Sequence, residues 1–136
     1  PAALTCTLMQ GSGTFAVEAA IGSAVPRDGR IAIVNNGAYG KRMVEIADRL
    51  GIDRVEIAFA ETEIADPDRI RAVLAADAKI THLSMAHCET TTGMLNPAEA
   101  VGRVAAEHGV AFILDAMSSF GGIEMTAESV GAAFLI

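Results

Sequence analysis

The sequence predicts an α/β protein in which helices cover both faces of a mostly parallel β-sheet. Short apolar runs alternate along the chain with Ala-rich amphipathic stretches, which is the order of elements in βαβ units. Two runs, Ile31–Val34 and Val110–Leu114, are apolar throughout, as strands are when helices bury both faces. Gly51 and Gly109 each follow a predicted helix, at the position where glycine commonly ends one.

Each element is predicted from its local pattern. The predicted strands are Leu4–Met9, Arg30–Asn35, Arg54–Ala60, Ile80–His87, Val110–Asp115 and Ala132–Ile136. The predicted helices are Phe15–Ala24, Gly40–Leu50, Asp68–Ala76 and Pro97–His108. In the last helix, apolar residues recur at helical spacing between Pro97, which suits a first turn, and Gly109 just past the end.

Length and composition indicate one globular domain and exclude several classes of partner. The chain has 136 residues, of which 51% are hydrophobic, with 10 basic and 17 acidic residues and a net charge of −7. The basic residues are scattered, so neither nucleic acid nor a membrane is expected as a partner. Apolar runs are of strand length, and no charged leader is visible. Cys6 and Cys88 lie far apart, which predicts no disulfide framework, no metal site and a cytoplasmic location.

The residues that follow the strands are the candidates for function, because ligands bind outside the carboxyl ends of the strands in open α/β sheets. The first segment, QGSGTFAVEAA, is a glycine-rich turn that opens a helix. Ser12, Gly13 and Thr14 could cradle a phosphate there, since the helix N-terminus supplies free N–H groups. A plain tight turn uses the same residues.

A dinucleotide-binding domain of an oxidoreductase is the rival interpretation of this turn. Gly11, Gly13 and Ala16 satisfy the GxGxxA fingerprint of that fold. The fingerprint also predicts an acidic residue at the end of the second strand, and the sequence has Asn35 and Asn36 there.

Two further segments carry polar or aromatic side chains to the same edge. NNGAYGKR contains Tyr39, the only tyrosine, which could stack on a flat ring or simply cover the core. HCETTTGMLNP is a hydroxyl-rich loop around Thr90, in which Asn96 is expected to cap the next helix. Glu89 in this loop is expected to be a solvated carboxylate.

The fourth segment, FILDAMSSFGG, ends an apolar strand at Asp115. A carboxylate at such a position needs a partner, because an unpaired charge beside a low-dielectric wall is costly. Capping of the following amides is one solution. Neutralising a cationic ligand group, such as a protonated pyridine nitrogen, is the other.

Taken in order, these four segments resemble fold-type I pyridoxal-phosphate aminotransferases of class V. QGSGTFAVEAAIGSAVP, NGAYGKRM, HCETTTGMLNP and DAMSSFGGIEM carry the resemblance over nearly the whole chain. Within the class, the sequences of these motifs are more similar to those of the enzymes of phosphonate catabolism than to those of the alanine:glyoxylate and serine:pyruvate aminotransferases. The resemblance implies transfer of an amino group from 2-aminoethylphosphonate to pyruvate, giving phosphonoacetaldehyde and alanine, in a homodimer.

The resemblance also implies a role for each candidate residue. Ser12, Gly13 and Thr14 would hold the phosphate of pyridoxal 5'-phosphate, and Thr90 would hydrogen-bond the ring oxygen. Tyr39 and Met117 would lie on the two faces of the ring. Asp115 would be the catalytic residue of this chain and would pair with the ring N–H.

One feature departs from the family pattern. The Schiff-base lysine of the family is expected beyond Ile136, and the only lysines here are Lys41 and Lys79, neither at a matching position. Residues 1–136 are therefore expected to be a partial cofactor-binding large domain that lacks the C-terminal small domain. Such a chain is expected not to turn over substrate by itself.

Overall fold

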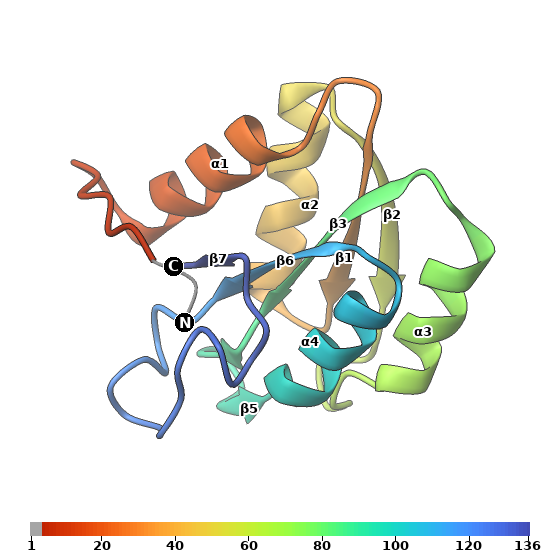
Figure 1. The fold of residues 1–136 in the computed structure, drawn as a ribbon. Coiled ribbons are helices and arrows are strands. Elements are labelled where there is room, and N and C mark those ends of the chain that lie inside the picture. Colours follow the sequence, from red (N-terminus) through yellow and green to blue (C-terminus); the bar gives the residue numbers. More distant parts are fainter. Residues whose placement is uncertain (1–3) are drawn as a thin grey trace.

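The computed structural model describes residues 4–136 and contains a five-stranded parallel sheet with strand order β2-β1-β3-β6-β7 (Figure 1). The strands of this sheet are β1 (Arg30–Asn35), β2 (Asp53–Ala58), β3 (Ile80–Ala86), β6 (Ala111–Asp115) and β7 (Phe134–Leu135). A separate antiparallel hairpin consists of β4 (Cys88–Glu89) and β5 (Met94–Leu95).

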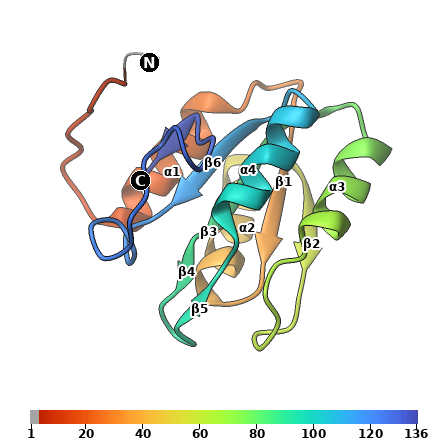
Figure 2. The ribbon, with the colours of Figure 1, turned by 60° about the horizontal axis from the view of Figure 1, so that its bottom comes forward.

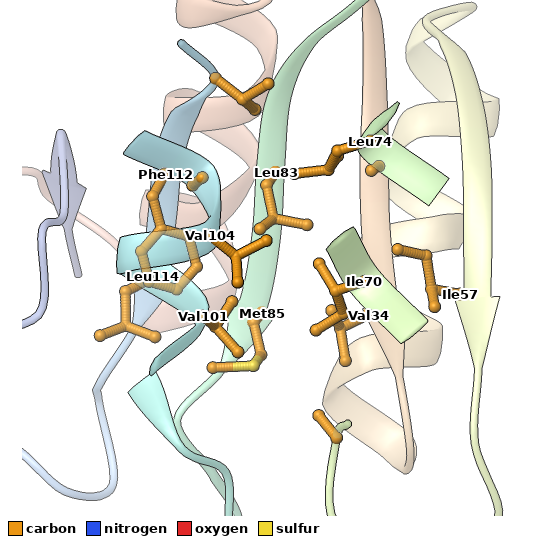
Figure 3. Packing of buried hydrophobic residues seen from close by; sticks show 14 of the residues in the cluster. Val34, Ile57, Ile70, Leu74, Leu83, Met85, Val101, Val104, Phe112 and Leu114 are labelled. Carbon is orange, nitrogen blue, oxygen red and sulfur yellow. The ribbon is translucent and has the colours of Figure 1, made fainter. Parts of the chain in front are cut away.

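Helices cover both faces of the sheet, as Figures 1 and 2 show. The helices are α1 (Gly13–Ala24), α2 (Ala38–Leu50), α3 (Pro67–Ala76) and α4 (Ala98–Glu107). Helices α1 and α2 pack on one face, where Ile21, Ile33 and Met43 belong to one buried cluster. Helices α3 and α4 pack on the other face. There, their buried apolar side chains form a second cluster with those of β1, β2, β3 and β6 (Figure 3). Both layers bury the strands, which explains their continuous apolar runs.

Local signals in the sequence set the ends of the helices. Ser12 caps α1, its Oγ accepting a hydrogen bond from the Phe15 N–H at 3.3 Å. Asp66 caps α3 in the same way through the Asp68 N–H, and Pro67 occupies the first helical position. Gly51 ends α2 in the left-handed conformation, with a φ of 67°.

The predicted fold class is confirmed, and most predicted elements lie within a few residues of their observed bounds. Strand Arg30–Asn35 has the predicted ends. Strand Ala132–Ile136 is shorter than predicted, because only Phe134–Leu135 pair with β6. Of the described helices, none is long and apolar enough to cross a bilayer.

The predicted strand Leu4–Met9 is wrong. This segment forms no strand and is exposed, with Leu8 94% accessible, and Figure 2 shows it running away from the body of the molecule. An extended segment becomes a strand only when a neighbour pairs with its N–H and C=O groups. Within the described chain this segment pairs with neither edge of the sheet, β2 or β7.

The hairpin was not predicted, and the expectation that Asn96 caps α4 is wrong. Asn96 does not cap α4 with its side chain. Its side-chain amide is buried and forms two reciprocal hydrogen bonds with that of Asn36. Asn36 Nδ2 donates to Asn96 Oδ1 at 2.8 Å, and Asn96 Nδ2 donates to Asn36 Oδ1 at 3.2 Å. It also accepts from the Ala65 N–H and donates to the Ala86 carbonyl. These hydrogen bonds connect the end of β1 to the end of β3. The Asn96 amide is used for them and not for a helix cap, because a buried amide needs a partner for each of its polar atoms.

Candidate functional site

The carboxyl ends of β1, β3 and β6 meet at one edge of the sheet, beside the N-terminus of α1. A cavity of about 360 Å³ lies there. It is lined by Ser12, Gly13, Thr14, Tyr39, Cys88, Thr90, Asp115, Met117 and Ser118. All seven residues singled out from the sequence therefore line a single cavity, although they come from four separate segments. Cys88 and Ser118 complete its wall.

The first turn of α1 forms the part of the cavity that suits an anion. The N–H groups of Gly13 and Thr14 have no intrahelical partner, because the first N–H groups of any helix lack one. No acidic residue lies in this turn, so the positive end of the helix dipole is not neutralised locally. The turn follows an exposed segment rather than a strand, which removes the structural context that the dinucleotide fingerprint requires.

Asp115 gives the cavity a carboxylate at the end of β6. Its Oδ1 accepts a hydrogen bond from the Met117 N–H at 3.0 Å, which is the local capping predicted as an alternative. Burial raises the pKa of the Asp115 carboxyl, the nearby Glu89 carboxylate raises it further, and the Met117 N–H opposes both effects. A single hydrogen bond does not compensate for the burial of the Asp115 carboxylate. A cation bound in the cavity would provide a second favourable partner.

The loop after β6 connects the separate walls. The Ser118 hydroxyl donates to the Cys88 carbonyl at 2.9 Å, which joins this loop to β4. The Met117 side chain packs so closely on the first turn of α1 that a Cβ atom at Gly13 would lie 2.8 Å from Met117 Cγ. Glycine at position 13 therefore lets the loop and the helix approach each other.

Glu89 is a site residue that sequence reasoning missed, and the expectation that it is solvated is wrong. The residue is fully buried, with a relative exposure of 0%. Its carboxylate accepts hydrogen bonds from the N–H groups of Tyr39 and Gly40. These partners lie about fifty positions away in the sequence, so no local pattern around Glu89 could have found them.

The remaining titratable groups contribute little to the cavity. Within the described residues, no lysine or arginine lines it, so Lys41 and Lys79 both lie elsewhere. His87 is buried and does not line this cavity; its Nδ1 lies 2.8 Å from Ser119 Oγ, and burial lowers its pKa. No cluster of metal-ligating side chains occurs in the described part of the chain.

Solved structures share this fold over nearly the whole chain. Pyridoxamine-pyruvate aminotransferase from Mesorhizobium loti superposes with a TM-score of 0.87 at 32% sequence identity, over 92% of this chain and 32% of that chain. Alanine–glyoxylate aminotransferase from Nostoc sp. gives a TM-score of 0.83 at 32% identity, over 90% of this chain and 32% of that one. The architecture is therefore that of the fold-type I pyridoxal-phosphate aminotransferases.

The sequence comparisons narrow this class to a family. The family model for aminotransferase class-V matches residues 7–136, so the chain belongs to the class-V aminotransferase family, whose members depend on pyridoxal phosphate. A 2-aminoethylphosphonate–pyruvate transaminase from Syntrophobacter fumaroxidans is 55% identical over 135 residues, which are 99% of this chain and 36% of that protein.

A second relative combines two activities in one protein. The bifunctional phosphonoacetaldehyde hydrolase/aminoethylphosphonate transaminase of Clostridioides difficile is 50% identical over 132 residues, 97% of this chain and 21% of that protein. The chain thus spans about a third or less of the length of these curated relatives. The predicted resemblance to class V is confirmed, and the dinucleotide-binding alternative is not supported.

Proposed function

We propose that the cavity holds pyridoxal 5'-phosphate and that the complete protein transfers the amino group of 2-aminoethylphosphonate to pyruvate. The observation that carries the proposal is that one cavity combines a helix N-terminus, whose Gly13 and Thr14 N–H groups have no partner within the helix, with a half-buried carboxylate. A ligand with a phosphate at one end and a protonated ring nitrogen at the other satisfies both. The volume of the cavity falls within the range of small-ligand sites, roughly 300–1,000 Å³.

In this proposal each lining residue has one task. The N-terminus of α1, with Ser12, Gly13 and Thr14, binds the phosphate through N–H and hydroxyl donors. Thr90 donates its hydroxyl to the ring oxygen. Tyr39 and Met117 flank the two faces of the ring and exclude water from them.

Asp115 is the catalytic residue of this segment because it holds the proton on the ring nitrogen. When bound, pyridoxal phosphate supplies an electron-withdrawing ring that stabilises the charge developed when the substrate loses its α-proton. The Asp115 carboxylate keeps the ring cationic, and in return the cation removes the cost of burying that carboxylate.

The remaining groups required for turnover are proposed to lie outside residues 1–136, which form part of the large domain. No lysine lines the cavity among the described residues, and the curated relatives are about three times as long as this chain. The lysine that holds the cofactor covalently and the arginine that binds the acidic substrate group would then come from the remaining chain.

We also propose that the complete protein is a cytoplasmic homodimer. Several large apolar side chains are exposed, among them Phe15, Phe120 and the cavity-lining Met117, which is typical of a surface that a second subunit covers. Both cysteines are free thiols, which suits a reducing compartment. Light scattering of the complete gene product tests the dimer.

The test of the reaction is direct. The complete gene product, supplied with pyridoxal phosphate, is expected to form alanine from pyruvate and 2-aminoethylphosphonate. Alanine or serine with glyoxylate serve as competing substrate pairs. Formation of alanine only from other amino donors would refute the proposed substrate, and no transamination with any pair would refute the proposed activity.

A further inference from the structure

Helix α2 lacks a cap of its own at the cavity wall. Its N-cap residue is Gly37, which has no side chain to accept a hydrogen bond, and no acidic residue lies in its first turn. Most helices satisfy their first N–H groups with a nearby Ser, Thr, Asp or Asn. In α2 the acceptor comes instead from the hairpin, fifty residues further along the chain.

Glu89 supplies that acceptor with both oxygens. Its Oε1 accepts from the Gly40 N–H at 2.8 Å, and its Oε2 accepts from the Tyr39 N–H at 3.1 Å. The side chain is fully buried, where an unpaired carboxylate would be strongly unfavourable. Two N–H donors and the positive end of the α2 dipole stabilise it there.

The main chain of Glu89 holds a second part of the cavity wall, the turn with Thr90. Its carbonyl accepts hydrogen bonds from the N–H groups of Thr92 at 3.1 Å and Gly93 at 2.7 Å, which close the turn that carries Thr90. One residue therefore contacts both the turn with Thr90 and the helix turn with Tyr39.

We infer that Glu89 is a positioning residue that fixes the Tyr39 wall of the cavity relative to the Thr90 wall. The inference rests on the proposed function for the identity of the ligand, a phosphorylated pyridine, but not for the hydrogen bonds themselves. Because Tyr39 flanks the ring and Thr90 binds its oxygen in that proposal, the spacing of the two walls determines whether the ring can contact both residues at once.

Gly37 has a specific reason to be glycine in this arrangement. A Cβ atom at position 37 would lie 2.7 Å from Glu89 Oε2 and 2.8 Å from Glu89 Cδ. The substitution Gly37→Ala therefore displaces the Glu89 carboxylate by steric contact, without changing its chemistry. It gives a second, independent way to disturb the same contact.

The first measurement is amide hydrogen exchange in the complete gene product, followed by mass spectrometry. Glu89→Gln keeps one acceptor oxygen but presents an amide N–H to the other backbone N–H. Peptides that cover Tyr39 and Gly40 are expected to exchange about tenfold faster in Glu89→Gln and in Gly37→Ala. Asp66→Asn is the matched control, because Asp66 caps α3 away from the cavity, and it should change exchange only in α3.

The second measurement is the affinity for pyridoxine 5'-phosphate, which has no aldehyde and cannot react with lysines. Glu89→Gln and Gly37→Ala are expected to weaken binding by about tenfold, and Asp66→Asn by less than about twofold. The double variant should lose little more than either single variant, since both disturb one contact. If Glu89→Gln does not fold, Gly37→Ala decides the same question.

Three results would overturn the inference. Unchanged exchange at Tyr39 and Gly40 in both variants would show that Glu89 does not hold α2. Faster exchange with unchanged affinity for pyridoxine 5'-phosphate would reduce Glu89 to a purely structural cap. Failure of the unaltered protein to bind pyridoxine 5'-phosphate would instead refute the proposed cofactor, and with it the ligand part of this inference. The exchange result would still show whether Glu89 caps α2.

Discussion

Asp115 and Glu89 show at the residue scale that two carboxylates near one cavity can be stabilised to different degrees. Glu89 accepts two backbone N–H groups, whereas Asp115 accepts one, from Met117. Burial and the neighbouring Glu89 carboxylate raise the pKa of Asp115. A residue held in an unfavourable state in the absence of ligand is typical of functional sites.

The substitution Asp115→Asn tests the proposed catalytic role. The amide keeps the hydrogen bond from Met117 but cannot hold a proton on a ring nitrogen as a carboxylate does. We expect kcat of the complete protein to fall by about 100-fold and the affinity for pyridoxine 5'-phosphate by about tenfold. Steady-state kinetics and equilibrium binding check these values, and an unchanged kcat would contradict the role.

The same substitution, which is expected to lower activity, is expected to raise the stability of the protein in the absence of ligand. The pKa of Asp115 is raised in the folded state, so the folded protein binds more protons than the unfolded chain between the two pKa values. The free energy of unfolding attributable to this group therefore falls as pH rises through that interval.

We thus expect Asp115→Asn to be more stable than the unaltered protein at pH 7, with the difference shrinking as pH falls from the raised pKa of the folded state to the ordinary pKa of an aspartate and staying constant below it. Urea unfolding at a series of pH values without ligand measures this difference. A variant that is less stable at neutral pH, or a difference that does not change with pH, would contradict the account.

The two carboxylates also show what sequence reasoning can reach at this scale. Asp115 could be identified because it directly follows an apolar run, and the end of such a run marks the ligand edge of a parallel sheet. Glu89 could not, because its partners Tyr39 and Gly40 are brought to it only by the pairing of β1 with β3 and the packing of α2.

At the scale of elements, the helices and inner strands were predictable because their signals are local. Ser12, Pro67 and Gly51 mark helix ends in the sequence, and the apolar run of β6 marks a buried strand. Leu4–Met9 has the same strand-like composition but forms no strand, since strand formation depends on a neighbour that the run itself does not specify. The short hairpin β4–β5 lacks a long apolar pattern, so its polar loop gave no sign of pairing.

Two helix glycines give opposite predictions for the same substitution. A Cβ atom at Gly102 in α4 would lie 1.9 Å from the Val130 carbonyl oxygen, a backbone atom that cannot move away easily. We expect Gly102→Ala to lower the free energy of unfolding by about 2 to 3 kcal/mol. Chemical denaturation measures the loss.

Gly22 in α1 is the matched control. Its added Cβ atom would meet only the end of the flexible Leu50 side chain, at 3.2 Å. Since alanine favours a helix over glycine by up to about 1 kcal/mol, Gly22→Ala is expected to be neutral or slightly stabilising. Equal losses in both variants would mean that the close approach of α4 to Val130 does not determine the cost.

At the scale of the whole molecule, the strand order explains where the site lies. The chain passes from β1 outward to β2 and then returns to place β3 on the other side of β1. Connections therefore diverge at the carboxyl ends of β1 and β3, and the resulting crevice is where open α/β sheets bind ligands. Tyr39 follows β1, Thr90 follows β3 and Asp115 ends β6, so three segments distant in sequence face one cavity.

The central claim is that this cavity binds the phosphate of a pyridoxal-type cofactor at α1 and its ring nitrogen at Asp115. A crystal structure of the complete gene product with pyridoxine 5'-phosphate tests it most directly. We expect the phosphate within hydrogen-bond distance of the Gly13 and Thr14 N–H groups and the ring nitrogen against the Asp115 carboxylate. A ligand bound at another edge of the sheet, or bound here with its phosphate at Asp115, would contradict the account.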